Sequence, residues 1–196
     1  MRILYTILVV FSASIISCNS NTNNATSSKE QQAPAPVVTP SSKLGADDNT
    51  KLVNMLNNYY ALKDALVATS GDKATTAAKM MINGLDSFKA GVEKTDAVIL
   101  PSINNYLDTI KTELGIIAGY DVKKINDIRM HFAKISGPMF TLCKKLELKN
   151  SGLYLQHCPM AFDDTGANWL SNYSEIKNPY YGDKMLECGE IEDSLK

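Results

Sequence analysis

The sequence is poor in the residues that most often carry enzyme chemistry or bind nucleic acid. It has two histidines, His131 and His157, so a nucleophilic triad built on histidine has little to draw on. It has no G-x-S-x-G motif and no glycine-rich phosphate-binding loop. The formal net charge is −1, and Arg129 is the only arginine after Arg2, so the basic surface that nucleic-acid binding requires is missing. We therefore expect neither an enzyme nor a nucleic-acid-binding protein.

The sequence also has no hydrophobic run at its start that is long enough to cross a bilayer. The apolar run 3–11 follows Arg2 and is followed by small residues, which is the layout of an export signal. It ends in Ile15-Ile16-Ser17-Cys18, which resembles the bacterial lipobox. That resemblance implies that residues 1–17 are a lipoprotein signal peptide and that Cys18 is acylated. The alternative is a general export signal in which Cys18 has no role.

Residues 18–48 are predicted to be the acylated cysteine and a disordered tether. The segment is rich in Asn, Ser, Thr, Ala and Pro, and it has too few large apolar groups to offset the entropy of ordering. No polybasic stretch follows Cys18, so we expect attachment to the membrane through lipid alone. Asn19 follows the cysteine, which in the better-studied lipoprotein sorting rule favours the outer membrane. We expect an envelope protein on the outer membrane, facing the periplasm.

Helical periodicity dominates residues 49–149. Apolar residues recur every three or four positions and predict helices over about 49–69, 72–92, 96–117 and 121–142. Short connections favour antiparallel neighbours, so the expected fold is mainly α, an up-down four-helix bundle. Pro138 should kink or split the last helix. Five methionines at core spacing are expected to pack inside: Met55, Met80, Met81, Met130 and Met139.

The C-terminal segment, residues 150–196, has a cysteine and a methionine at each end of a Gly/Pro/Tyr-rich stretch. Cys158 and Met160 are two residues apart, and Met185 and Cys188 are three apart, so each pair could face one point in a strand or a helical turn. Thiolate and thioether sulfur select soft cations such as Cu(I) or Ag(I). His157 or His131 could add a nitrogen ligand. Residues 153–158 are predicted to be extended. Residues 184–191 could pair with them as a short β-hairpin, or form a helical turn leading into one, which would bring Cys158 and Cys188 close together. We expect the segment to pack on the bundle with Trp169 buried.

The same cysteines have a second interpretation. In an oxidising periplasm Cys158 and Cys188 could form a disulfide, which would stabilise the fold by roughly 3.5–4 kcal/mol for a loop of about 30 residues. The methionines would then be ordinary apolar cover. With Cys18 acylated, Cys143 would remain unpaired and buried as a small hydrophobic residue.

The short motifs of this segment are similar to those of one family. The strings CPMA, GANWLS, NPYYG and MLECG resemble the C-terminal signature of an uncharacterised domain family of Bacteroidetes-type bacteria. That family occurs as small lipoproteins and at the C-terminal end of membrane fusion proteins of heavy-metal efflux pumps. The resemblance covers about residues 49–191. It implies that Cys158, Met160, Met185 and Cys188 are the family's sulfur positions, and that His131 is its histidine on the last long helix.

Two hypotheses follow for function. The first is an accessory protein that binds Cu(I) or Ag(I) and works with heavy-metal efflux components. The second is a non-catalytic interaction module of the envelope in which Cys158 and Cys188 form a disulfide that only stabilises the fold.

Overall fold

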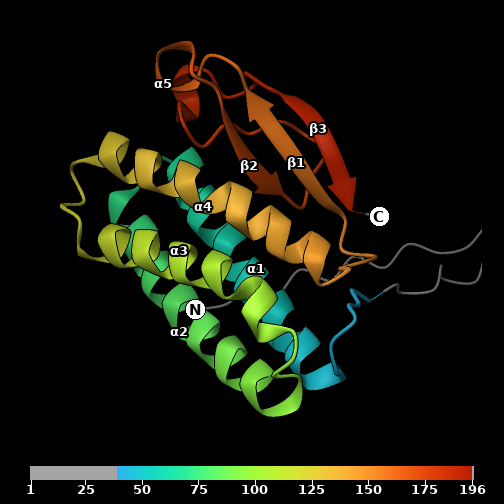
Figure 1. Cartoon of the computed structure of the whole chain (residues 1–196). Coiled ribbons are helices and arrows are strands. Elements are labelled where there is room, and N and C mark those ends of the chain that lie inside the picture. The colour runs from blue at the N-terminus through green and yellow to red at the C-terminus, as the bar shows by residue number, and fades with distance from the viewer. Residues whose placement is uncertain (1–38, 196) are drawn as a thin grey trace, which may run out of the picture. The chain divides into compact units, whose positions relative to one another are not determined.

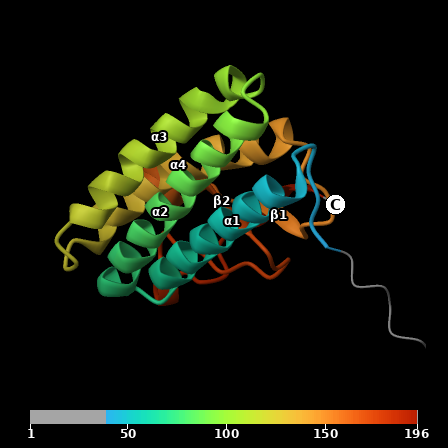
Figure 2. The ribbon, with the colours of Figure 1, turned by 90° about the horizontal axis from the view of Figure 1, so that it is seen from below.

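Four long helices make up most of the structure, a computed structural model in which residues 39–195 are described. They are α1 (Ala46–Val67), α2 (Gly71–Thr95), α3 (Leu100–Gly119) and α4 (Ile125–Lys145). The connections between them are only a few residues long, so successive helices run antiparallel and pack as neighbours (Figure 1). Figure 2 shows the same four helices from below. The predicted antiparallel four-helix bundle is confirmed.

The helix boundaries differ from the predicted ones at the starts of α1, α3 and α4. The helix α1 begins three residues earlier than Asn49, after Gly45 as its N-cap. The helix α4 begins at Ile125 rather than at Asp121, because Asp121 forms a turn of its own. Its Oδ1 accepts a hydrogen bond from the backbone N–H of Lys123 at 3.0 Å. Asp121 therefore stabilises the loop between α3 and α4 and does not cap the helix.

Pro138 does not split α4, which is helical from Ile125 to Lys145. A proline in a helix removes one backbone hydrogen bond, here the one to the carbonyl of Lys134 four residues earlier. Lys134 is exposed. The neighbours Ile135 and Met139 are fully buried, so packing on both sides of Pro138 holds the helix together.

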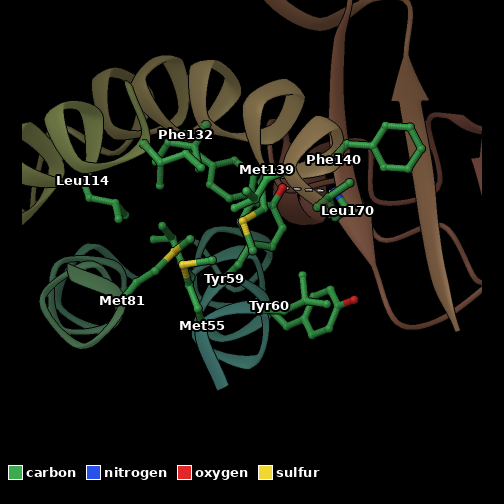
Figure 3. Packing of buried hydrophobic residues seen from close by; sticks show 14 of the residues in the cluster. Met55, Tyr59, Tyr60, Met81, Leu114, Phe132, Met139, Phe140 and Leu170 are labelled. Atoms are coloured by element: carbon green, nitrogen blue, oxygen red, sulfur yellow. Dashed lines mark hydrogen bonds between the residues drawn. The ribbon is translucent and has the colours of Figure 1, made fainter. Parts of the chain in front are cut away.

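The core between the helices consists of aliphatic, aromatic and methionine side chains (Figure 3). Met55, Met81 and Met139 are fully buried there, as predicted. Met80 and Met130, however, are 55% and 45% exposed, so the prediction that they pack inside is wrong. The three-to-four-residue spacing of the methionines alone did not distinguish helix positions that face the core from positions at the solvent-exposed margin.

A small antiparallel sheet follows the bundle, in the strand order β2-β1-β3. Its strands are β1 (Leu153–Cys158), β2 (Ala167–Ser171) and β3 (Glu190–Leu195). The extended segment predicted over 153–158 is confirmed as the central strand, while β2 was not predicted. The stretch expected to pair with β1 from residue 184 is at first a turn that includes the 3₁₀ helix η1 (Gly182–Lys184), and pairing begins only at Glu190.

Tyr59 fastens this sheet to the bundle. Its hydroxyl accepts a hydrogen bond from the backbone N–H of Leu170 in β2 at 3.0 Å, drawn as a dashed line in Figure 3. The same hydroxyl lies 2.7 Å from Ser136 Oγ in α4. Trp169, next to Leu170, is fully buried. The prediction that the C-terminal segment folds back on the bundle and buries Trp169 is therefore confirmed.

Candidate functional site

Two thiols meet at one end of the sheet, where the central strand finishes. Cys158 is the last residue of β1, opposite Ala167 in β2, and Cys188 lies in the turn that leads into β3. Their Sγ atoms are 3.1 Å apart, and both cysteines are free thiols. A disulfide bond would require about 2.05 Å. The predicted proximity of Cys158 and Cys188 is confirmed, because the two ends of the Gly/Pro/Tyr-rich stretch come together.

The contact between the sulfurs also affects their ionisation. The hydrogen bond with Cys158, helped by partial burial, raises the pKa of the Cys188 thiol to about 11. Cys158 itself is completely buried. At neutral pH Cys188 therefore keeps its proton, and any cation that binds there as to a thiolate must displace it.

Asn178 holds the turn that carries Cys188. Its side-chain Nδ2 donates to the carbonyl of Cys188 at 2.8 Å, and its Oδ1 accepts from the backbone N–H groups of Tyr180 and Tyr181. Its own N–H donates to the carbonyl of Leu186 at 2.8 Å. Asn178 is fully buried, so these bonds are needed to satisfy it. Sequence reasoning missed this role, and its only signal was the Asn-Pro pair that opens the NPYYG string.

Gly189 explains why a glycine follows Cys188. Its φ is +147°, and a Cβ atom there would lie 2.6 Å from the carbonyl oxygen of His157 and 2.8 Å from Cη2 of Trp169. No larger residue fits this approach without moving the strand or the indole. The glycine thus lets the backbone beside Cys188 lie directly against β1.

The two methionines named with the cysteines differ in position. Met185 and Cys188 line one shallow surface depression of about 360 Å³, together with Leu186 and Glu187. Met160 is 46% exposed, and its backbone carbonyl accepts a hydrogen bond from the Tyr181 hydroxyl. Met185 is therefore the methionine that shares a surface depression with a cysteine.

The two histidines have other partners. Nδ1 of His131 lies 2.6 Å from Glu113 Oε2, which links α4 to α3. His157 is next to Cys158 in β1, so its ring points to the opposite side of the sheet. There Nδ1 is within hydrogen-bond distance of Asn168 Oδ1 and lies 3.8 Å from Glu192 Oε1. The structure therefore brings Cys158 and Cys188 together, and Met185 lines the same depression as Cys188, while both histidine rings are engaged elsewhere.

The remaining cysteines are separate from this pair. Cys143 in α4 is fully buried, and burial raises the pKa of its thiol to about 12, so it is a poor nucleophile and ligand. Cys18 and the predicted signal peptide lie outside residues 39–195. Within that range no helix is long and apolar enough to cross a membrane. The same part of the chain has no cluster of three or more His, Cys, Asp or Glu side chains suited to a metal ion, a criterion that does not count methionine.

The chain is similar to a family described as "Protein of unknown function (DUF3347)", whose model matches residues 55–151, just under half of the sequence. The match runs from Met55 in α1 to the end of the bundle and includes His131. It ends before β1, so none of the four sulfur residues falls within it. Comparisons with curated proteins and with solved structures found no match.

Proposed function

We propose that this protein is an envelope lipoprotein that binds a soft monovalent cation, Cu(I) or Ag(I), and works as a non-enzymatic accessory of heavy-metal efflux or homeostasis. The observation that carries the proposal is the 3.1 Å contact between the Cys158 and Cys188 thiols. Two thiols at one point, with the Met185 side chain in the same depression as Cys188, are the donors that soft cations prefer.

Binding the cation requires a small movement of the sulfurs. Two thiolates bound at about 2.3 Å to one ion lie about 3.7–4.6 Å apart, depending on the angle at the ion. The Sγ atoms must therefore separate by at least about 0.6 Å from their present 3.1 Å. Cys188 is in a turn at the surface and is only partly buried, so it can move more easily than Cys158 in its strand. Because the thiols lose their protons on binding, affinity should rise with pH.

The proposed location rests on residues 1–48. If Cys18 is acylated, the bundle is tethered to the outer membrane and reaches into the periplasm. Cys18→Ala should then give a protein that no longer partitions with membranes and incorporates no fatty acid. A variant that still sediments with membranes and still carries fatty acid would refute the lipid anchor but not the metal site.

A structural disulfide is the second candidate, and the same sulfur distance favours it. Closing the Sγ atoms by about 1 Å would form the bond, with two electrons and two protons passing to a thiol oxidant of the envelope. The protein would then be a non-catalytic interaction module. Counting free thiols in lipid-modified protein kept under non-reducing conditions separates the two, since the module leaves only Cys143 free and the metal-binding form leaves three thiols.

The affinity of the reduced full chain for Cu(I), measured against a chromophoric Cu(I) chelator, tests the proposal. We expect Cys158→Ser and Cys188→Ser each to weaken Cu(I) binding at least about a hundredfold. Each change removes a direct ligand, and the loss of a residue that only orients a ligand already costs about ten- to a hundredfold in affinity. Met185→Leu should weaken it about tenfold and Met160→Leu less, with nearly unchanged thermal stability.

Two variants serve as matched controls. Cys143→Ala removes a thiol outside the pair, and Met80→Leu removes an exposed thioether far from it in α2, so neither should change the affinity more than about twofold. Cu(I) binding that survives Cys188→Ser, or that falls as much in Cys143→Ala, would overturn the proposal.

A further inference from the structure

A second cavity lies between α4 and the loops of the C-terminal segment, near the turn α5 (Ala161–Asp164). Its volume is about 320 Å³, at the lower end of the range for small-molecule sites. Figure 1 shows α5 over the N-terminal half of α4. The lining residues that matter for its chemistry are Arg129, Met130, Phe162, Asp163, Tyr181 and Lys184.

Arg129 is the unusual group in this cavity, because it is 5% exposed and all its partners are neutral. Its Nε donates to the carbonyl of Pro179 at 2.8 Å, and Nη2 donates to the carbonyl of Leu66 and to Thr69 Oγ1. Nη1 donates to Asn126 Oδ1 at 3.2 Å. Among residues 39–195, no carboxylate forms an ion pair with Arg129. A buried charge without a counter-charge is uncommon, since desolvation is offset only by opposite charge or hydrogen bonds.

One donor of Arg129 is left for a ligand. Nη1 carries two N–H groups, and within the described part of the chain only one of them has an acceptor, Asn126 Oδ1. Burial also lowers the pKa of the Arg129 guanidinium, because no opposite charge compensates for the loss of its hydration. An anion in the cavity would supply both the missing acceptor and the missing charge.

The rest of the cavity fixes the charge and shape of that anion. Lys184 is exposed at the rim and has no ion-pair partner in residues 39–195. Asp163 contributes one negative charge, so with Arg129 and Lys184 the cavity carries a formal charge of +1. A monoanion would neutralise that charge, whereas a dianion such as phosphate would leave the cavity negative and would be repelled twice as strongly by Asp163.

Part of the cavity wall is apolar. Phe162, Tyr181 and the exposed Met130 provide surfaces for a flat hydrocarbon group. Phe162 and Asp163 are held in the left-handed region, with φ of +54° and +55°, which costs on the order of 1–3 kcal/mol for each such residue. This backbone places the Phe162 ring edge-on to Tyr180, with centroids 5.2 Å apart. Strain of this kind is often kept where a binding site needs it.

We infer that this cavity binds a small organic monoanion, a carboxylate on a flat aromatic body, with the carboxylate at Arg129 and Lys184 and the ring between Phe162, Tyr181 and Met130. This site is separate from the thiol pair and does not depend on the proposed metal function.

Methyl NMR of the full chain, labelled with ¹³C at the methionine methyl groups and titrated with benzoate, tests the inference. The Met130 methyl signal should shift and saturate, while that of the exposed Met80 in α2 stays unchanged. A ligand of this size is expected to bind with a Kd of about 1–10 mM. Benzamide, which has the same shape without the charge, should bind at least about tenfold more weakly.

A charge-reversed variant keeps the test independent of folding. Lys184→Glu changes an exposed side chain that forms no hydrogen bond or ion pair with residues 39–195, and it should weaken benzoate binding about tenfold. Lys79→Glu, the same change on an exposed part of α2, should alter it less than twofold. The inference is overturned if Met130 shows no saturable shift up to about 100 mM benzoate, if benzamide binds as well, or if the two lysine variants behave alike.

Discussion

The bundle and the C-terminal segment are stabilised in different ways. The helices bury apolar side chains that recur along each helix, and left-handed residues outside glycine occur only where a helix has ended, at Thr69 and Glu147. The C-terminal segment instead has a series of positive-φ residues: Asn150, Gly152, Phe162, Asp163, Asp164, Gly166, Gly182 and Gly189. It is also organised around buried polar groups such as Gln156 and Asn178. The difference teaches that many substitutions are tolerable in a core of interchangeable apolar groups, whereas the thiol pair depends on a few irreplaceable contacts.

The contact between the two regions should be the most sensitive point. Arg129→Met would leave the carbonyl of Pro179 buried without a donor and would leave the carbonyl of Leu66 with only the backbone N–H of Thr69, so we expect the free energy of unfolding to fall by about 3 kcal/mol. Trp169, the only tryptophan, reports on the C-terminal segment by fluorescence, and far-UV circular dichroism reports on the helices. The fluorescence transition should move to lower denaturant than the helical one. Lys184→Met is the control and should change both transitions little. If both transitions of Arg129→Met stay together near the wild-type midpoint, the contact between the two regions is not the most sensitive point.

Glycines in the two regions should respond in opposite directions to a methyl group. Gly189→Ala would force a Cβ atom against the His157 carbonyl and the Trp169 ring, and should destabilise the fold by about 2–3 kcal/mol. Gly115→Ala in α3 meets no atom within 4 Å and should stabilise by about 0.5–1 kcal/mol. Urea denaturation of both variants measures the contrast. Equal effects would mean that the close approach at Gly189 is not needed.

Two neighbouring tyrosines allow the attachment of the sheet to be tested separately from the packing of the bundle. Tyr59→Phe would leave the N–H of Leu170 without its acceptor and should destabilise the fold by about 1.5 kcal/mol. The hydroxyl of Tyr60 is buried and has no hydrogen-bond partner among residues 39–195, so Tyr60→Phe should be neutral or stabilising. Thermal unfolding compares them. A larger loss in Tyr60→Phe than in Tyr59→Phe would contradict this account of how the sheet is attached.

The smallest effect concerns the reactivity of Cys188 in the reduced protein. Because its pKa is raised from an ordinary value of 9.0 to about 11, the stability that this shift contributes is present below pH 9 and is lost as the pH rises towards 11. At about pH 8 its alkylation by iodoacetamide should be about tenfold slower than in unfolded chain, since a hundredfold smaller thiolate fraction is partly offset by higher nucleophilicity. Cys158→Ala should speed it up by removing the hydrogen bond, and an unchanged rate would show that the sulfur contact does not control the thiol.

The bundle could be predicted from the sequence because its signal is local. The spacing of residues such as Leu52, Leu56 and Tyr59 records the buried face of α1 directly. The strand β1 and the meeting of Cys158 with Cys188 were also predictable, since a folded excursion brings its ends together.

The features that were missed depend on contacts that leave no pattern in the sequence. Arg129 donates to carbonyls 50 and 63 residues away, and backbone carbonyls carry no sequence signal. Asn178 acts through backbone groups of its own loop, and β2 is recognisable only once β1 is in place beside it. Exposure of Met80 and Met130 depends on which face of each helix the rest of the chain covers.

X-ray absorption spectroscopy at the copper edge of the Cu(I)-loaded, reduced full chain tests the central claim most directly. If the C-terminal segment holds the cation through Cys158, Cys188 and Met185, the first shell should consist of two to three sulfur atoms at about 2.2–2.3 Å. The sulfur signal should be lost in the Cys158→Ser, Cys188→Ser double variant and kept in Cys143→Ala. A first shell of nitrogen and oxygen only, or one that the double variant leaves unchanged, would contradict the account.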